Sequence, residues 1–334
     1  MTTTISLPTR DCIVIGCDSL ATTPAPYLNP HLVLSTFFEE SGALKIDQDG
    51  NPLLKSSSQL RSCTEYLPVN QLPNATKLFR LGDLPAGLLF AGNSRIGDQS
   101  IRALVENCVE QLQLNTNTDL LKTADQLLDF LNDKISKAYP DDHKENRPSM
   151  DIILSGYSKD SWKPEILRIK PGIDEKVTNE LENEDLKISF GGQYDVIERV
   201  VHGIDFDNFY KLNLKHENIL LNYHKSLQEW LKKEDSKIEI PEPDLTDENL
   251  KLFGRDFGGV CGIITHLGNL SEQAAINLVE FLIQTMINAQ YFSDRIPTVG
   301  GQIHVALINP KDGFKWISKE EFKFKGHSVP RYEH

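Results

Sequence analysis

The chain has 334 residues, of which 39% are hydrophobic and 25% are charged, a balance that supports a folded core. Its formal net charge of −13 opposes a phosphate-binding surface, because affinity for nucleic acids is largely electrostatic, so we expect neither DNA nor RNA as a partner. A length prior of about 150 residues per domain suggests two domains, yet no Pro/Gly-rich linker separates two self-sufficient halves.

Two short β-prone runs begin the chain. Thr2–Leu7 and Cys12–Thr22 are rich in Thr, Ile and Val, and the four residues between them are typical of a turn. If the last residue of the first run lies opposite the first residue of the second, Thr2 falls opposite Cys17 and beside Asp18. We therefore predict an antiparallel hairpin that brings a carboxylate to the N-terminus.

Thr2 has a chemical interpretation as well as a structural one. Initiator Met is normally trimmed before a residue as small as Thr, which leaves Thr2 with a free α-amine whose reference pKa is roughly 8. That amine can accept the proton of the Thr2 hydroxyl at neutral pH, and Asp18 can orient the terminus as the third group of a triad does. The structural alternative is that three threonines begin an exposed strand and that Asp18 only ends the next strand.

Residues 23–74 contain six prolines and a polar Lys-Ser-Ser-Ser tract, with a short strand expected around residues 32–38. We predict a surface insertion of about fifty residues, a length at which loops commonly carry function. It either hangs over a cleft beside Thr2 or forms part of an oligomer contact.

The next two strands each contain one residue of chemical interest, Lys77 within residues 75–81 and Gly92 within residues 88–93. A single lysine on a strand is usually a solvated charge, but apolar neighbours indicate a core strand, and a cation near the Thr2 amine would lower the pKa of that amine. A glycine on a buried strand lets a substrate backbone approach an amide that faces a developing oxyanion. The alternative for this glycine is packing beneath a helix.

From residue 94 the hydrophobic period becomes helical. Two amphipathic helices are predicted over residues 94–139, with Asn117 or Thr118 as the N-cap of the second and Asp119 in its first turn. The remaining predicted elements are strands at 150–157, 164–169 and 187–190, a helix at 270–291, and strands at 301–308 and 313–317. This order of strands and helices is that of an αββα sandwich.

A second insertion is expected over residues 203–257. It contains an amphipathic helix near residues 212–231 and an acidic, Pro-bearing stretch at 234–249, which we interpret as a solvated arm. The last residues, 322–334, begin with alternating Phe and Lys and are expected to cover a strand edge or a neighbouring subunit.

The cysteines and the apolar runs indicate a reducing compartment. The five cysteines show no CxxC or zinc-like spacing, so we interpret them as buried hydrophobes, and the nine histidines form no metal-binding pair. No apolar run approaches the ~20 residues that span a bilayer, and no signal peptide is recognisable. We expect a cytoplasmic protein with no membrane partner.

Several of these blocks resemble proteasome β subunits and the bacterial proteasome-like peptidase that works with an ATP-driven unfoldase. The opening Thr-Thr-Thr-Ile, the Ile-Val-Ile strand and the Asp-Ser-Leu-Ala-Thr that follows keep the family's spacing from Thr2 to Asp18. The strand with Lys77 resembles the one that carries the catalytic lysine, and the strand with Gly92 resembles the one that forms the oxyanion hole. The strand over residues 149–157 resembles the one that opens with an auxiliary serine.

One turn departs from the family pattern of an Asp, two residues, a Ser and a Gly pair. Asp294 matches that Asp, but two residues are added before the Gly pair at 300–301, and Val299 stands where the family has Ser. Thr298 supplies the missing hydroxyl only if the turn bulges. The auxiliary roles that the resemblance implies for Ser149 and Asp294 therefore depend on this turn.

The resemblance covers nearly the whole chain and implies one domain over residues 1–334, an α+β fold with the four-layer αββα sandwich of N-terminal nucleophile hydrolases. It implies a threonine peptidase in which Thr2 attacks, its α-amine moves the proton, and Gly92 donates to the oxyanion. In this mechanism Asp18 and Lys77 orient and tune the nucleophile. The implied substrate contacts are Ala21, Thr22, Phe79, Phe90 and Ser94, and the two phenylalanines predict an apolar residue before the cut bond.

The expected partners follow from that resemblance. The substrate is a peptide or unfolded protein, no cofactor is needed, and a homo-oligomeric ring or stack of rings encloses the sites, with an ATPase partner left open. Two alternatives stay open: a small-molecule amidase on the same fold, whose cleft the two insertions would enclose, and an inactive assembly subunit, which the altered turn would explain.

Overall fold

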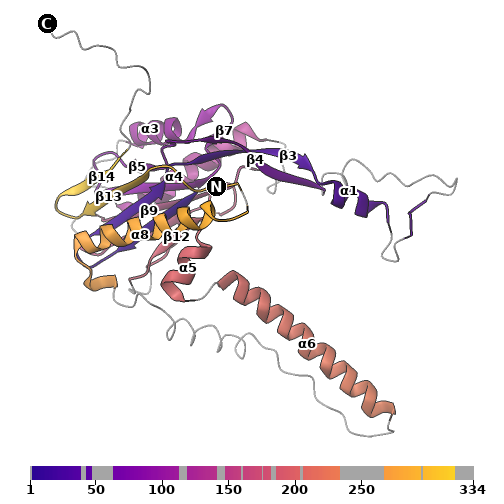
Figure 1. The fold of residues 1–334 in the computed structure, drawn as a ribbon. Helices are drawn as coiled ribbons and strands as arrows, with labels where there is room; N and C mark the ends of the chain where they lie inside the picture. The colour runs from indigo at the N-terminus through magenta and orange to yellow at the C-terminus, as the bar shows by residue number, and fades with distance from the viewer. Residues whose placement is uncertain are drawn as a thin grey trace.

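The computed structural model describes residues 2–38, 43–46, 63–112, 119–140, 147–158, 161–174, 176–181, 186–203, 206–233, 267–294 and 296–319. These residues form a mixed α/β fold with two five-stranded antiparallel sheets and two smaller two-stranded ones (Figure 1). None of the helices in this part of the chain is both long and apolar enough to cross a bilayer.

The first sheet has the strand order β12-β1-β2-β13-β14. Its strands are β1 (Thr3–Pro8), β2 (Ile13–Asp18), β12 (Ser189–Gly192), β13 (Ile303–Asn309) and β14 (Gly313–Ser318). Every residue of β1 and β2 is buried, because one face of the sheet meets helices and the other meets the second sheet. The N-terminal strand therefore lies in the interior of the molecule.

The predicted hairpin of β1 and β2 is present, but its predicted register is wrong by two residues. Pro8 lies opposite Ile13 and Thr4 opposite Cys17, because the turn is closed by the Thr9 amide, which donates to the Cys12 carbonyl at 2.8 Å. A shift of two keeps every side chain on its expected face of the sheet. It places Asp18 beside Thr3 instead of Thr2.

The second sheet has the strand order β11-β10-β9-β6-β5 and packs face to face with the first. Its strands are β5 (Leu78–Arg80), β6 (Ala86–Gly92), β9 (Met150–Gly156), β10 (Glu165–Ile169) and β11 (Thr178–Asn179). The facing surfaces are apolar, as in the contact of Ile15 with its neighbours Leu89 and Ile153 in one buried cluster. Within them the hydroxyls of Ser6 and Ser155 lie 2.7 Å apart and satisfy each other.

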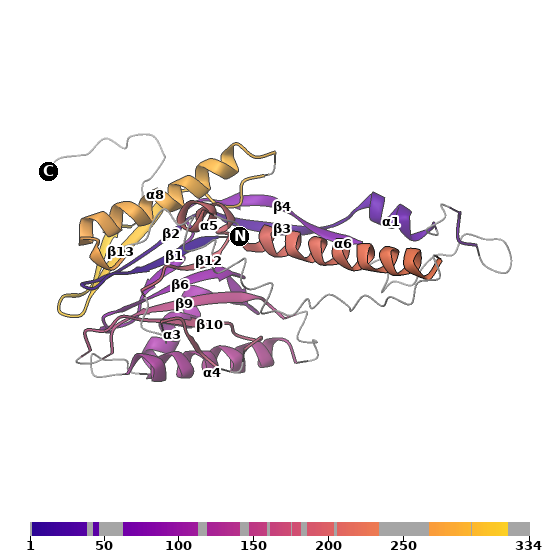
Figure 2. The ribbon, with the colours of Figure 1, turned by 90° about the horizontal axis from the view of Figure 1, so that it is seen from below.

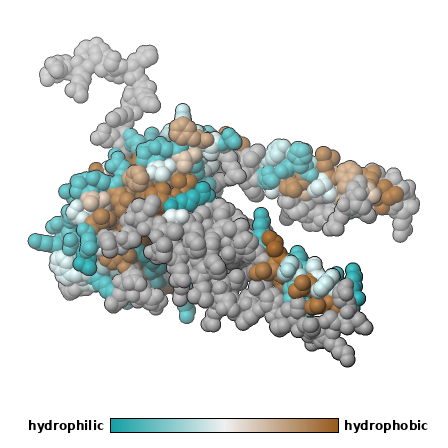
Figure 3. Space-filling view, turned by 60° about the horizontal axis from the view of Figure 1, so that its bottom comes forward, coloured by the Kyte–Doolittle hydropathy of each residue, from teal (hydrophilic) through white to brown (hydrophobic). Residues whose placement is uncertain are grey.

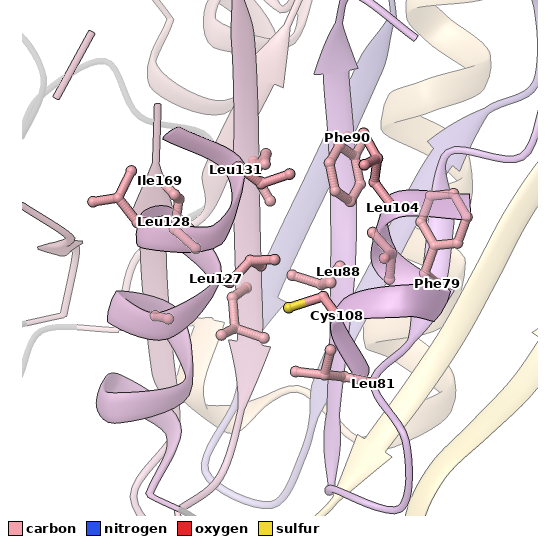
Figure 4. Packing of buried hydrophobic residues seen from close by; sticks show 14 of the residues in the cluster. Phe79, Leu81, Leu88, Phe90, Leu104, Cys108, Leu127, Leu128, Leu131 and Ile169 are labelled. Atoms are coloured by element: carbon pink, nitrogen blue, oxygen red, sulfur yellow. The ribbon is translucent and has the colours of Figure 1, made fainter. Parts of the chain in front are cut away.

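Helices cover the outer faces of both sheets. The order from α8 through the two sheets to α4 is visible in Figure 2. The helices are α3 (Ile101–Leu112) and α4 (Leu120–Ala138) on the second sheet, and α5 (Asp195–His202) and α8 (Glu272–Tyr291) on the first. Figure 4 shows the interface of α3 and α4 with the second sheet, which is formed by Leu104, Cys108, Leu127, Leu128 and Leu131 of the helices with Leu88, Phe90 and Ile169 of the strands.

The start of α4 corrects one prediction. Asp119 is the N-cap rather than a first-turn residue, and its side chain accepts a hydrogen bond from the Lys122 amide at 2.9 Å. Asn117 and Thr118, the two predicted caps, lie outside the described residues.

Two segments project from the layered body (Figures 1 and 2). The first is a ribbon of β3 (Ala21–Leu28) and β4 (Thr64–Leu72), which carries α1 (Pro30–Thr36) at its far end. The strand predicted around residues 32–38 is wrong, because Asn29 caps a helix whose first residue is Pro30. The second projection is α6 (Phe206–Lys233), which confirms the predicted helix in the second insertion; residues 234–249 and 322–334 lie outside the described residues.

Short elements complete the described fold. They are β7 (Arg95–Ile96), β8 (Gln99–Ser100) and the 3-10 turn η2 (Leu267–Asn269). The pair β7 and β8 connects the end of β6 to the start of α3, and the Ile101 amide donates to the Ser94 carbonyl at 2.9 Å. This connection forms one wall of the cleft described next.

Candidate active site

Asp18 is the hub of a buried polar cluster at the C-terminal end of β2. Its Oδ1 accepts hydrogen bonds from the Thr3 amide at 2.9 Å and from Lys77 Nζ at 2.8 Å. Its Oδ2 accepts from the amides of Leu20 at 3.2 Å and Gly300 at 3.0 Å. The side chain is fully buried, so these four donors replace the water that an ionised carboxylate requires. Asp18 thereby joins the ends of β1, β2, β5 and β13.

Lys77 lies immediately before β5 and is buried, with 8% of its side chain exposed. Its ammonium group also donates to the Leu20 carbonyl at 2.6 Å. A buried lysine beside a core strand, with both a carboxylate and a carbonyl as acceptors, is not a solvated edge charge. The sequence-based alternative for Lys77 is therefore wrong.

Thr2 precedes β1 and is 4% exposed. Its carbonyl accepts a hydrogen bond from the Gln193 amide at 2.7 Å, while the Thr3 hydroxyl donates to the Gln193 carbonyl at 2.6 Å. These two bonds fix the terminus against the end of β12. Asp18 contacts the neighbouring residue Thr3 and not Thr2 itself.

A cleft of about 540 Å³ opens at this terminus. Seven of the residues expected to act in catalysis or substrate binding line it, namely Thr2, Ala21, Thr22, Lys77, Phe90, Gly92 and Ser94. The ribbon contributes a wall through Leu72, Pro73 and Asn74. Asn74 is in the left-handed region with φ of 69°, the only non-glycine residue there in the described chain, and such backbone outliers cluster at ligand sites.

Gly92 ends β6 in a conformation that favours glycine, with φ of +100°, and it is exposed to the cleft. A Cβ at this position would overlap the carbonyl of Ser149, the residue immediately before β9, and would crowd Met150 Cα at the start of that strand. The close approach of two strands thus requires glycine here. The alternative explanation for this glycine, packing beneath a helix, is therefore wrong, because the neighbour that leaves no room for a side chain is a strand and the residue before it.

Four expected site residues lie outside the cleft lining, namely the buried Asp18 and also Phe79, Ser149 and Asp294. Phe79 lines an adjoining cavity of about 370 Å³ and supports Phe90 from behind, with ring centroids 5.4 Å apart in an edge-to-face pair. Ser149 is exposed, and its carbonyl accepts from the Asn93 amide at 3.0 Å. Asp294 is exposed beyond the end of α8.

The altered turn before β13 is held by two glutamines that the sequence did not single out. Gln290 of α8 accepts hydrogen bonds from the amides of Thr298 at 2.7 Å and Val299 at 2.9 Å. The Thr298 hydroxyl donates to Gln193 Oε1 at 2.8 Å, and Gln290 Nε2 also donates to that oxygen. Thr298 is therefore buried in this network. Gln193 connects the turn to Thr2 and Thr3, which makes it a positioning residue.

Cys17 is the other potential nucleophile near this cluster. Burial raises the pKa of its thiol, and Asp18 raises it further, whereas Lys77 lowers it. The thiol therefore stays protonated and buried, and it is a poor nucleophile. The four described cysteines are all buried and form no disulfide with one another. Among the described residues, no group of three or more His, Cys, Asp or Glu side chains is arranged so that it could hold a metal ion.

Gly192 offers a test of how tightly Thr2 must be held. Its φ is +76°, and a Cβ there would overlap the Thr2 carbonyl oxygen. We expect Gly192→Ala to displace Thr2 and to lower the rate of any reaction at Thr2 about a hundredfold, the effect of a misplacement near 1 Å.

Gly313→Ala is the matched control, because Gly313 has φ of +73° but no atom within 4 Å of the added Cβ. It should show only backbone strain of about 1 kcal/mol in urea unfolding. Equal rates in the two variants would contradict the expectation.

Comparison with known proteins finds likenesses among solved structures, including two structures of Anbu. No family model matches the chain, and no curated protein matches it. The chain is similar to the structure of an Anbu (Gly-1) mutant from Hyphomicrobium sp. strain MC1, at 11% identity over 95% of this chain and 87% of that one, with a TM-score of 0.48. It is also similar to Anbu, described as an ancestral beta-subunit, from Yersinia bercovieri, at 8% identity over 96% and 88% of the two chains, with a TM-score of 0.46.

Proposed function

We propose that this chain is an N-terminal nucleophile hydrolase that cleaves peptide bonds with Thr2 after removal of Met1. The observation that carries the proposal is the buried pair of Asp18 and Lys77, 2.8 Å apart, at the base of a cleft that Thr2 lines. Burying two charges is unfavourable for stability unless every donor and acceptor is satisfied. Such a pair beside a chain terminus is typical of a catalytic cluster, where ionisable groups are arranged to tune a nucleophile.

The residues support the following sequence of steps. The α-amine of Thr2 takes the proton of its own hydroxyl, and the Thr2 oxygen attacks the peptide carbonyl. The positive charge of Lys77 favours the neutral amine, while Asp18 keeps Lys77 and β1 in place. The Gly92 amide would stabilise the oxyanion. The amine then protonates the leaving group, and water releases the acyl product in the reverse sequence.

The layered fold supports this assignment. Two face-to-face sheets with helices on both outer surfaces are what the αββα sandwich of N-terminal nucleophile hydrolases requires, and β1 is an inner strand of its sheet, preceded by Thr2 at the cleft. We propose that the chain has this fold, and that the ribbon and α6 are insertions in it.

The N-terminus provides the direct test. Mass spectrometry of the intact protein should show the loss of one methionine, because methionine aminopeptidase acts before small residues such as Thr. A peptide epoxyketone, which reacts with a hydroxyl and the adjacent amine together, should then add once, and peptide mapping should place it on Thr2. Retention of Met1 on the whole population would block the base and reject the mechanism.

Two alternatives have specific observations in their favour. An inactive assembly subunit is favoured by the exposure of Asp294 and by the burial of the Thr298 hydroxyl against Gln193. A small-molecule amidase is favoured by the ribbon residues that wall the cleft. Covalent labelling of Thr2 would reject the first alternative, and turnover of small amides without turnover of peptides would support the second.

The assembly state separates the peptidase from the amidase. We propose a closed homo-oligomer in which the two projections contact other copies, because both carry exposed apolar side chains (Figure 3). These side chains are Tyr27, Leu28 and Val69 on the ribbon and Ile219, Leu220, Tyr223 and Trp230 on α6. A stable monomer in sedimentation velocity would remove the compartment and favour the amidase.

A further inference from the structure

The charge of the cleft lining is opposite to that of the protein. The chain has a formal net charge of −13, with 48 acidic and 35 basic residues. Among the described residues that line the cleft, the titratable side chains are Lys77, Arg95 and Arg102, and all three are cationic. A cavity lined by one sign of charge concentrates ligands of the other sign, and its low-dielectric walls strengthen the effect.

The three cations have different roles. The ammonium group of Lys77 is occupied by Asp18 at 2.8 Å and by the Leu20 carbonyl at 2.6 Å, so it is not available to a ligand. Arg102 contacts Glu106 through Nε alone at 2.9 Å, and both side chains are more than half exposed, at 60% and 62%. Arg95 donates through one terminal nitrogen to the Asp98 carbonyl at 3.4 Å, a neutral and weak acceptor. Within the described residues, Arg95 and the terminal nitrogens of Arg102 are therefore available to an anionic ligand.

The fold brings both arginines to the same side of the cleft. Arg95 follows Gly92 by three residues, which sets an upper limit of roughly 10 Å between their Cα atoms. The antiparallel pairing of Arg95 with Ser100 returns the chain, so that Arg102 in the first turn of α3 follows two residues later. Gly92 and both arginines thus belong to the lining of the same cleft.

The cleft also has an apolar portion beneath these charges. Phe90 and Ile101 line it and are buried, with 6% and 5% exposed. A side chain that fits both features has a methylene stem and a terminal carboxylate, which is the structure of glutamate. Guanidinium groups are suited to carboxylates, since they can form two parallel hydrogen bonds.

We propose that the cleft selects peptides with an acidic residue, glutamate in particular, next to the bond that Thr2 attacks, and that Arg95 and Arg102 receive its carboxylate. The position relative to the cut bond rests on the proposed function, whereas the charge preference rests on the cleft alone. This inference differs from the apolar preference that Phe79 and Phe90 predict, because Phe79 lies outside the cleft lining.

Equilibrium binding to the Thr2→Ala protein tests the preference without turnover. Fluorescein-labelled hexapeptides that differ only in one central residue, Glu, Gln, Leu or Lys, are compared by fluorescence polarisation. We expect the Glu peptide to bind about tenfold more tightly than the Gln peptide, the effect of one charge-assisted hydrogen bond. The ratio should fall as salt is raised from 0.05 to 0.5 M, because the arginines are exposed; these concentrations span Debye lengths of roughly 14 to 4 Å.

Variants of Arg95 and Arg102 test whether these two side chains cause the preference for the Glu peptide. Arg95→Met with Arg102→Met should bring the Glu to Gln ratio to about one, whereas Arg95→Lys with Arg102→Lys should retain part of it. Arg10→Met is the matched control, since Arg10 lies in the β1–β2 turn at the opposite end of β1 from Thr2. It removes the same charge and should leave the ratio unchanged. Thermal unfolding confirms that each variant is folded before its ratio is interpreted.

The outcomes separate this inference from the proposed function. A Gln, Leu or Lys peptide that binds as well as the Glu peptide, a ratio insensitive to both arginines, or no measurable binding would overturn the inference. If the unmodified protein, with Thr2 intact, cleaved Leu peptides fastest, the glutamate preference would be overturned while the proposed peptidase function would be supported. Selective binding of the Glu peptide without any turnover or Thr2 labelling would sustain the inference and reject the proposed chemistry.

Discussion

Replacing Thr2 with alanine is expected to abolish epoxyketone labelling and to lower peptide turnover by about a thousandfold or more. Alanine keeps a free α-amine after Met1 removal but lacks the hydroxyl, so only the attacking atom is lost. Thr2→Ser retains a hydroxyl and should keep labelling and part of the turnover. The measurements are the labelled fraction by intact mass and kcat/KM with a fluorogenic peptide.

Thr76→Ala is the matched control for that experiment. Thr76 also lines the cleft and is exposed, so its replacement removes a threonine hydroxyl from the same cavity without touching the N-terminus. Labelling at full stoichiometry is expected in this variant. Labelling that persists in Thr2→Ala, or that disappears equally in Thr76→Ala, would place the chemistry elsewhere and favour the assembly subunit.

The sequence predicted the core of the fold because hydrophobic periodicity records burial directly. The Thr-, Ile- and Val-rich composition of β1 and β2 indicated strands, and the three- and four-residue spacing in α3, α4 and α8 indicated helices that cover a sheet. The hairpin register was missed because the turn closes between Thr9 and Cys12, and a two-residue shift leaves the pattern of buried faces unchanged. Periodicity cannot distinguish such registers. The shift nevertheless changes which backbone amide Asp18 contacts.

The helix α1 shows the opposite case, in which the sequence carries a local signal for a helix but the residues that follow favour a strand. Residues 32–38 have a strand-like composition, yet Asn29 and Pro30 form an N-cap and first-position pair that starts a helix. The cap accepts hydrogen bonds from His31 and Leu32, which satisfies donors that a strand would have to pair elsewhere.

The site was predicted in part because some of its residues carry local patterns. Thr2, Asp18 and Lys77 stand at recognisable places in strands, whereas Gln193 and Gln290 are 97 residues apart and meet only in the folded chain. A single glutamine has no local signature, so a long-range network of this kind is visible only in the structure. Asp294 was chosen for its place before a Gly pair. In the structure Asp294 is exposed and lies outside the cleft, whereas Thr298 and Val299 of the same turn are bound to Gln290.

The buried pair of Lys77 and Asp18 should dominate the stability of this region. Lys77→Met removes the ammonium but keeps much of the side-chain volume, and it leaves the Asp18 carboxylate with three backbone amides as its donors. We expect a loss of about 3–5 kcal/mol in the free energy of unfolding, because an unpaired charge then remains buried. Urea unfolding measures the loss, and an unchanged m-value shows that the transition stays comparable.

Lys137→Met provides a matched comparison. Lys137 and Asp133 in α4 form a contact of 2.7 Å, as short as that of Lys77 with Asp18, but their side chains are 72% and 52% exposed. Because exposed pairs are solvated and screened, this variant should lose at most about 0.5 kcal/mol. Equal losses in Lys77→Met and Lys137→Met would show that the environment of Asp18 is as polar as solvent.

Asp18→Asn completes this test, because it removes the charge that Lys77 neutralises. Each oxygen of Asp18 accepts from two donors, so an amide nitrogen in place of either oxygen would leave two donors without an acceptor. The double variant Asp18→Asn with Lys77→Met should be less destabilised than the sum of the two single variants, since neither charge is then left alone. Both single variants should also slow epoxyketone labelling of Thr2 while the protein remains folded in the absence of urea. If the double variant lost as much free energy of unfolding as the two single variants together, the two side chains would act independently. Asp18 would then not act on Thr2 through the charge of Lys77.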